Sequence, residues 1–391
     1  MPFFPSERVK NIQSPPIVLL NTLASKLEGV ISLGQGVPCF TPPEIIYQAL
    51  FEEMQNTKTH IYSPDMGLED LRLILSSLLQ EKKQGSYQLE EIMITAGASQ
   101  AFINVCLTIL DVGDEVLLPS PFYFNHAMAI EAVGARPVEW PMQIKAGTFS
   151  LDLEQLPELI TSHTKVIVII SPNNPTGCVY SNSAIKKTLK IAQEKDLFVI
   201  FDNTYIDFNF IDETYNFSKL KEFSDRIIHI GSFSKSLGMS GWRCGYIAAR
   251  GIMEELLKIQ DTLVICAPVI SQLAVIGALR WSGYSAFLQE KKQELRERGE
   301  YLVKRLREIS FLEGGEIQGA FYVFPKIQIK KPIFSEKLAL NLLKEAKVLT
   351  IPGSAFGTAG EGFLRLSYGF PNIATVETAI ERLKFFQKKY I

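Results

Sequence analysis

A single lysine, Lys235, stands among small and hydroxyl-bearing residues in the segment GSFSKSLGMSGWRCGY. The small residues let another molecule approach the backbone closely, and the hydroxyls together with Arg243 offer hydrogen-bond donors to an anion. A lysine amine that loses its proton attacks an aldehyde and forms a Schiff base. These features favour a cofactor that carries both an aldehyde and a phosphate, which fits pyridoxal 5′-phosphate (PLP). A Gly/Ser-rich surface loop with an incidental lysine is the alternative interpretation.

Two further segments place chemistry where predicted strands end. Asp202 closes the apolar run LFVIF, at the edge of the sheet where α/β folds bind ligands. A buried carboxylate needs a partner there, and a protonated pyridine nitrogen is a suitable one. Gly97, in TAGASQ between a strand and a helix, permits a tight turn in front of helix N–H groups that favour an anion. A capping aspartate and an ordinary helix start remain the alternatives.

Three more residues have both a structural and a functional interpretation. Strand alternation puts Arg365 on one face with Phe363, which indicates either an anion or an internal salt bridge. Tyr123, in PFY, either stacks on a flat heterocycle or belongs to the core. Asn174 lies in NNPTG, which is also ordinary turn chemistry.

The lysine segment closely resembles the lysine signature of the class I/II aminotransferases, which are aspartate-aminotransferase-like PLP enzymes of fold type I. Further motifs follow in the family's order from about Leu33 to Gly369. The resemblance implies that Lys235 binds PLP and acts as general base and acid. It also implies that Asp202 pairs with the ring nitrogen, that Tyr205 and Asn174 bind the 3′ oxygen, and that Tyr123 covers the ring.

The same resemblance assigns the remaining site residues. Phosphate contacts are expected from Gly97, Ala98, Ser99, Ser232 and Arg243. Arg365, in RLSYG, is expected to bind the substrate α-carboxylate, and Gly36, in LGQG, to lie in a loop that closes over the substrate. Tyr62 matches a tyrosine that reaches the phosphate of the neighbouring subunit, which implies a homodimer with shared sites; a surface tyrosine in a loop is the alternative.

The implied activity is a ping-pong transfer of an amino group between an L-amino acid and a 2-oxo acid such as 2-oxoglutarate. Ser99 stands where some aspartate-type members have a lysine for a distal carboxylate. The motifs LGQG, TAGA and PFY look more like kynurenine-, glutamine- and methionine-type enzymes, which favours an aromatic or sulfur-containing donor over an aspartate-like one. A C–S β-lyase on the same fold is the nearest alternative, and a non-catalytic PLP-fold module is remote. A nicotinamide dehydrogenase is disfavoured because no G-x-G-x-x-G follows a strand.

The elements that position these residues alternate along the chain. Strands are expected at 91–95, 115–119, 136–140, 165–170, 197–202, 227–231 and 243–249, and helices at 43–55, 67–83, 99–110, 124–133 and 181–195, with more from 252. Runs such as VIVII are apolar at nearly every position, which is typical of strands buried on both faces. We therefore predict an α/β fold in which helices sandwich a mostly parallel central sheet.

A change of pattern after about residue 277 predicts a second, smaller α+β domain. Long charged helices are expected at 284–309, 336–346 and 375–388, with short strands near 321–325 and 363–367. The predicted domains are a large PLP-binding domain at 43–278 and a small domain made of 1–42 and 279–391.

The bulk composition agrees with a cytoplasmic enzyme. The chain has 391 residues and a net charge of −2, so nothing in its charge favours nucleic acid or an anionic membrane. No apolar run is long enough for a signal peptide or a membrane span. Five cysteines without a C-x-x-C pair argue against a disulfide framework or a structural zinc site, so no metal is expected.

Overall fold

The computed structural model describes residues 4–12, 16–145, 147–211 and 215–390. Within these residues, a seven-stranded sheet has the order β2-β10-β9-β8-β7-β3-β4. Its strands are β2 (Ile92–Thr95), β10 (Gly245–Ala249), β9 (Ile227–Ser232), β8 (Phe198–Asp202), β7 (Thr164–Ile170), β3 (Glu115–Ser120) and β4 (Arg136–Pro141). Strand β10 runs antiparallel to β2 and β9, and the other neighbours are parallel. The predicted mostly parallel α/β sheet is therefore confirmed.

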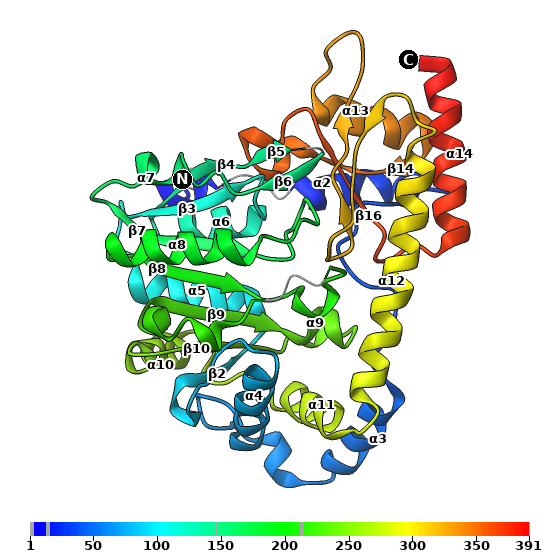
Figure 1. Ribbon diagram of the computed structural model, residues 1–391. Coiled ribbons are helices and arrows are strands. Elements are labelled where there is room, and N and C mark those ends of the chain that lie inside the picture. The colour runs from blue at the N-terminus through cyan, green and yellow to red at the C-terminus, as the bar shows by residue number, and fades with distance from the viewer. Residues whose placement is uncertain (1–3, 13–15, 146, 212–214, 391) are drawn as a thin grey trace.

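Helices cover both faces of this sheet (Figure 1). The helices of this part of the chain are α3 (Glu44–Glu53), α4 (Glu69–Glu81), α5 (Ala98–Ile109), α6 (Phe124–Ala132), α7 (Leu156–Leu159), α8 (Asn182–Glu194), α9 (Phe233–Ser236), α10 (Met253–Val264) and α11 (Val269–Arg280). Alternate residues of β7 pack in opposite directions. Val166 and Val168 join the cluster with α5, α6 and α10, whereas Ile167 and Ile169 join the cluster with α8. This two-sided burial explains why the strand is apolar throughout.

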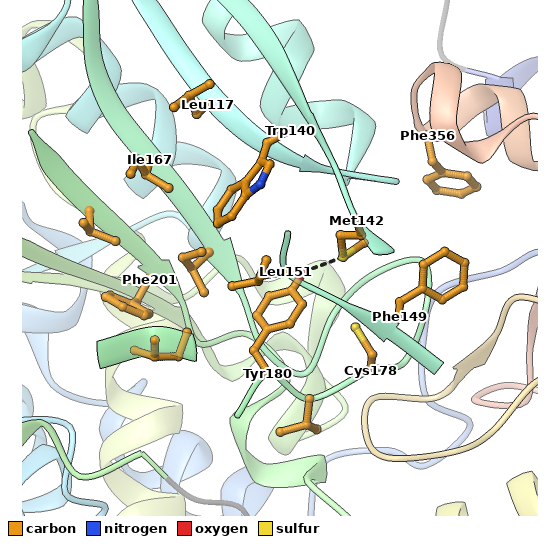
Figure 2. Packing of buried hydrophobic residues seen from close by; sticks show 14 of the residues in the cluster. Leu117, Trp140, Met142, Phe149, Leu151, Ile167, Cys178, Tyr180, Phe201 and Phe356 are labelled. Atoms are coloured by element: carbon orange, nitrogen blue, oxygen red, sulfur yellow. Dashed lines mark hydrogen bonds between the residues drawn. The ribbon is translucent and has the colours of Figure 1, made fainter. Parts of the chain in front are cut away.

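The cluster on the α8 side is rich in large side chains (Figure 2). Trp140 is fully buried and donates its indole N–H to the carbonyl of Asp152 at 2.7 Å. The Tyr180 hydroxyl lies 3.3 Å from the sulfur of Met142, as the dashed line in Figure 2 shows. Because these polar tips are paired, the aromatic rings can be buried without leaving a donor unsatisfied.

The rest of the chain builds smaller sheets and the long helix α12 (Tyr284–Leu306). These elements are α1 (Glu7–Asn11), α2 (Pro16–Ala24), β1 (Ile31–Ser32), β11 (Leu312–Glu313), β12 (Tyr322–Val323), β13 (Lys326–Ile327), α13 (Ser335–Asn341), β14 (Val348–Leu349), β15 (Ile351–Pro352), β16 (Leu364–Ser367) and α14 (Ile373–Tyr390). Parallel pairing of β1 with β14 joins the N-terminal segment to the C-terminal one. The domain boundaries themselves stay a prediction, and α1 packs against α6 of the central layers.

Three details differ from the expected elements. The helix expected at 336–346 is α13 followed by a π-helical turn, η7 (Leu342–Ala346). A hairpin of β5 (Gln143–Lys145) and β6 (Thr148–Ser150) was not expected. The sequence pattern did not give the direction of β10, which runs antiparallel to both of its neighbours. None of the helices in the described part of the chain is both long and apolar enough to cross a bilayer.

Candidate active site

The carboxyl ends of β7, β8 and β9 point toward α9 and β16 (Figure 1). A cavity of about 620 Å³ lies there, at the edge where open α/β sheets bind ligands. The predicted site residues that line it are Gly36, Ala98, Ser99, Tyr123, Asn174, Asp202, Tyr205, Ser232, Lys235, Arg243 and Arg365. Residues more than 300 positions apart in the sequence therefore meet in one pocket, although neither Gly97 nor Tyr62 lines it.

Lys235 projects from α9 into this cavity, and its Nζ donates to the carbonyl of Gly36 at 2.8 Å. Burial lowers the pKa of Lys235 to about 8, and the positive charges of Arg243 and Arg365 act in the same direction, while Asp202 opposes them. An amine with that pKa is partly unprotonated near neutral pH. It can therefore act as a nucleophile or as a base.

Asp202 ends β8 as a buried carboxylate with two donors. His126 Nε2 lies 3.2 Å from one carboxylate oxygen, and the backbone N–H of Thr204 donates to the other at 2.9 Å. Burial alone would raise the pKa of Asp202, but His126 and Thr204 outweigh it and lower the pKa below the ordinary value. A carboxylate has about four acceptor positions, so Asp202 can still bind one more donor in the cavity.

His126 is a functional neighbour that the sequence interpretation missed. Its ring stacks on Phe102 with centroids 4.0 Å apart and planes 17° apart, which fixes the imidazole beside Asp202. Tyr123, also in the site, lies three residues earlier, and its ring meets His126 edge-on at 5.4 Å. The spacing i, i+3 along a predicted helix is the signal that could have drawn attention to His126.

Arg365 is almost completely buried on β16, with 1% of its surface exposed. Its Nη1 donates to Asn174 Oδ1 at 3.0 Å, and its Nη2 donates to the carbonyl of Gly34 at 2.7 Å. The guanidinium also lies over the rings of Tyr322 and Phe356, at 4.7 and 5.0 Å. Among the described residues Nε has no hydrogen-bond partner. Such a buried cation with a spare donor is suited to an anionic ligand.

The opposite end of the cavity contains the donors expected for a phosphate. Helix α5 begins behind Gly97, whose φ is +84°, and its first N–H groups lack helical acceptors. Ser232 caps α9 by accepting from the N–H of Ser234 at 3.1 Å. Arg243 donates to the carbonyl of Ser240 at 2.9 Å. A Cβ at position 97 would come 2.5 Å from Arg243 Nη2, so any other residue would require this guanidinium to shift.

Three tyrosines line the same cavity as the lysine and the arginine. The Tyr205 hydroxyl accepts from Asn174 Nδ2 at 3.4 Å and lies 2.8 Å from the hydroxyl of Tyr322. Tyr123 accepts from Asn125 Nδ2 at 2.8 Å, and burial raises its pKa to about 12. Tyr322 is a second residue that the sequence interpretation missed, because its strand carries no motif that was assigned a role.

Tyr62 lies outside this cavity and is 73% exposed. It lines a different hollow of about 640 Å³, together with residues of the segment Cys266–Ile270. Ile61, beside it, is 64% exposed. A contact of Tyr62 with the cavity of its own chain is therefore absent from the described residues, which leaves a second chain as the place where it could act.

The cavity fits PLP in its chemistry. Lys235 is an amine with a lowered pKa, Asp202 is an ionised buried carboxylate, and the α5 N-terminus with Ser232 and Arg243 offers donors for a phosphate. These three features match an aldehyde, a protonated ring nitrogen and a phosphate group.

The profile of the family described as aminotransferase class I and II matches residues 28–383. An aspartate aminotransferase of Pyrococcus abyssi is 35% identical over 384 residues, covering 97% of each chain. The aromatic-amino-acid aminotransferase 2 of Thermococcus litoralis is 34% identical, again over 97% of each.

Solved structures give the same result. The aromatic aminotransferase from Pyrococcus horikoshii superimposes with a TM-score of 0.87 at 34% identity, over 95% of this chain and 99% of that one. The aspartate aminotransferase from Thermus thermophilus with maleate gives 0.90 at 29% identity, over 97% and 98%. The chain therefore belongs to the class I and II aminotransferases, and it is a PLP-dependent enzyme that transfers amino groups.

Proposed function

We propose that the cavity around Lys235 binds PLP and that its residues divide the work of amino transfer. When bound, PLP supplies an aldehyde that condenses with amines and a ring that accepts electrons from the bonds at the substrate Cα. Lys235 would hold PLP through its aldehyde carbon, and its amine, when free, would move a proton at the substrate Cα. A pKa of about 8 suits this task, because the best acid–base catalyst titrates near the working pH.

The other residues bind and orient. Asp202, ionised by its contacts with His126 and Thr204, pairs with the protonated ring nitrogen. Tyr205 and Asn174 donate to the 3′ oxygen, and Tyr123 covers the ring. Arg365 binds the substrate α-carboxylate with its remaining N–H groups, and the loop of Gly36 closes the site above Lys235.

The phosphate is bound at the helix end. Ala98 and Ser99 present backbone N–H groups, Ser232 a hydroxyl and Arg243 a guanidinium. The N–H of Gly97 donates instead to the carbonyl of Thr95 at 2.8 Å, so Gly97 shapes the turn before the helix. The observation that carries the whole proposal is that Lys235, Asp202 and Arg365 meet in one buried cavity although their sequence positions are far apart.

Borohydride reduction of the PLP-loaded enzyme followed by peptide mapping tests the covalent link. We expect the label on Lys235, and we expect Lys235→Ala to lose both the label and turnover. The matched control variant is Lys291→Ala. The Lys291 amine is also largely covered, with 17% of its side chain exposed, but it pairs with Glu290 and Glu294 outside the cavity. A label that stays in Lys235→Ala would refute the assignment.

The donor preference follows from the charges in the cavity. Among its described lining residues the cations are Lys235, Arg243 and Arg365, and each already has a role. The wall also contains the apolar side chains of Ile17, Val18, Phe124, Met128 and Ala129. A side-chain carboxylate would enter this surface without a cation from the same chain, which is unfavourable. We therefore propose an aromatic or sulfur-containing amino donor in preference to aspartate.

The donor half-reaction tests this preference without an acceptor. Phenylalanine, tyrosine, methionine and aspartate are mixed separately with the holoenzyme, and the loss of visible absorbance is followed. We expect the first three to react faster than aspartate. Ser99→Lys adds a cation to the cavity and should raise the rate constant for aspartate by roughly ten- to a hundredfold, since a charged hydrogen bond is worth about 1.5–3 kcal/mol. A wild-type enzyme that reacts fastest with aspartate would contradict the proposal.

We also propose that the enzyme works as a homodimer in the cytoplasm. The exposed Tyr62 and Ile61 beside an apolar hollow support a second chain at this surface. The five cysteines are all thiols in the structure, which suits a reducing compartment. Sedimentation of the holoenzyme tests the dimer, since a monomer at micromolar concentration would exclude shared sites.

A further inference from the structure

Tyr322 is a fully buried aromatic residue on β12 that lines the cavity, with 1% of its surface exposed. Its hydroxyl lies 2.8 Å from that of Tyr205, and its ring lies 4.7 Å from the guanidinium carbon of Arg365. It therefore contacts two residues that bind different parts of the reacting system.

The direction of the tyrosine hydrogen bond follows from counting protons. A phenol has one O–H to donate. The oxygen of Tyr205 already accepts from Asn174 at 3.4 Å. When Tyr205 donates its proton to the 3′ oxygen of the cofactor, the contact with Tyr322 persists only if Tyr322 is the donor. Tyr205 is also the hydrogen-bond partner that the described residues offer to the Tyr322 hydroxyl.

The surroundings hold the Tyr322 ring in place. Tyr322 pairs with Ser367 in the sheet formed with β16, two residues from Arg365. A Cβ at position 36 would lie 2.6 Å from the Tyr322 hydroxyl, so the Gly36 loop passes directly over it. The carbonyl of that same glycine accepts from Lys235.

We propose that Tyr322 is a positioning residue that couples the 3′-oxygen contact of Tyr205 to the carboxylate contact of Arg365. Its hydroxyl donates to Tyr205 and makes the Tyr205 proton a stronger donor, because hydrogen bonds in a chain polarise one another. Its ring stabilises the guanidinium of Arg365 in the buried site. This inference rests on the proposed contact between Tyr205 and the 3′ oxygen.

The hydroxyl is tested by Tyr322→Phe, which keeps the ring. A donor at the 3′ oxygen stabilises negative charge there, so the neighbouring Lys235 nitrogen gives up its proton more readily. Loss of the Tyr322 donor should raise the midpoint of the visible-absorbance pH titration of the holoenzyme by roughly 0.3–1 unit, the range expected for weakening one hydrogen bond. Tyr205→Phe should raise it further, and adding Tyr322→Phe to Tyr205→Phe should change nothing more.

Tyr368→Phe is the matched control. Tyr368 is equally buried, but its hydroxyl lies 3.5 Å from the carbonyl of Ala320 and does not line the cavity. We expect its titration midpoint to equal that of the wild type. If Tyr205→Phe shifts the midpoint while Tyr322→Phe does not, the inference is wrong and the proposed site stands. If Tyr205→Phe itself has no effect on the midpoint, both this inference and the proposed contact of Tyr205 with the 3′ oxygen fail.

The ring is tested by comparing Tyr322→Leu with Tyr322→Phe. Only the leucine variant removes the aromatic face from Arg365, so its KM for the amino donor should rise several-fold above that of the phenylalanine variant. Equal KM values in the two variants would overturn the ring contact. The phenylalanine variant fills the same volume, so the hydroxyl test holds even where the leucine variant is unstable.

Discussion

At the scale of single residues, the ionised state of Asp202 depends mainly on one histidine. Burial favours the neutral acid, and the hydrogen bond and charge of His126, together with the hydrogen bonds from Thr204, reverse that preference. His126 also lines the cavity, but its contact at this point is with the carboxylate of Asp202, so we expect it to act on the cofactor's ring nitrogen through that carboxylate. Phe102 fixes the imidazole plane by stacking at 4.0 Å. If Asp202 pairs with the ring nitrogen as proposed, the electron sink would depend on three residues from two helices and one strand.

His126→Phe should preserve the stacking and remove the hydrogen bond. We expect kcat to fall roughly ten- to a hundredfold, because a hydrogen bond to a charged group contributes about 1.5–3 kcal/mol. Steady-state kinetics with one donor measures this effect, and thermal unfolding shows whether the variant folds. His163, which is exposed, gives the control variant His163→Phe. An unchanged kcat in His126→Phe would mean that Thr204 alone keeps Asp202 ionised.

Lys235 predicts a pH dependence of stability in the PLP-free protein. Its folded pKa of about 8 lies below the ordinary value of 10.5, so the unfolded chain binds more protons between these values. The free energy of unfolding should therefore rise with pH across this window. Below the window, the protonated amine should lower the free energy of unfolding. Lys235→Met removes this amine and should stabilise the PLP-free protein at pH 7 by roughly 1–3 kcal/mol, with no gain above pH 10.5.

Urea unfolding of the PLP-free protein at several pH values checks this expectation. Lys291→Met is the control, because its two glutamate partners raise the pKa of Lys291 despite its partial burial. That variant should gain nothing at pH 7. A Lys235→Met variant with the wild-type pH profile would show that the amine is not desolvated in the folded protein.

Much of the site could be predicted from single residues, and the rest could not for a physical reason. Lys235, Asp202 and Arg365 each stand in a local pattern with few structural explanations. Tyr322 and Tyr205 are 117 positions apart, and their contact depends on where the fold places β12 relative to the segment that follows β8. No local pattern encodes such a contact.

At the scale of elements, buried amides connect the phosphate end of the cavity to the segment that carries Tyr62. Gln260 accepts from Asn104 of α5 at 2.8 Å and donates to the carbonyl of Ile94 at 3.3 Å. Gln272 of α11 accepts from the N–H of Leu68 at 2.7 Å and donates to Ser63 at 3.2 Å. The loop around Tyr62 is therefore held in place by hydrogen bonds within its own chain.

Gln272→Leu should disorder this loop more than it disturbs the core. The variant leaves the N–H of Leu68 and the hydroxyl of Ser63 without their partner, so we expect a loss of about 1–3 kcal/mol in the free energy of unfolding. Weaker PLP binding should accompany it if Tyr62 reaches a phosphate. Gln84 is equally buried but lies outside these contacts. Gln84→Leu should therefore leave PLP affinity unchanged, and equal affinity in both variants would contradict the role of the loop.

The predicted elements were most accurate where one pattern decides the structure. Strands β7 and β8 are apolar on both faces, and both lie within two residues of the predicted bounds. The hairpin of β5 and β6 is only three residues on each side and partly polar, so periodicity could not reveal it. The π-helical turn after α13 replaces the end of a predicted helix, because hydrophobic spacing does not distinguish the two.

At the scale of the whole molecule, one chain holds the residues that line the cavity and an exposed tyrosine that lies outside it. Tyr62 is 73% exposed and lines a hollow with Cys266 and Val269. A large exposed aromatic beside an apolar surface is typical of an interface. In a two-fold dimer each chain would give its tyrosine to the other's site, because the same surface serves both subunits.

Mixed dimers decide whether the sites are shared. Tyr62→Ala weakens the phosphate contact in trans, and Lys235→Ala removes the covalent link in cis. In a hybrid of the two variants, one site has Lys235 from the first chain and Tyr62 from the second, so it is intact, while the other site lacks both. Differently tagged hybrids should therefore bind about one PLP per dimer with wild-type affinity, measured by fluorescence titration. If Tyr62 acts within its own chain, the only site with Lys235 would also lack Tyr62, and the hybrid would bind PLP as weakly as the Tyr62→Ala homodimer.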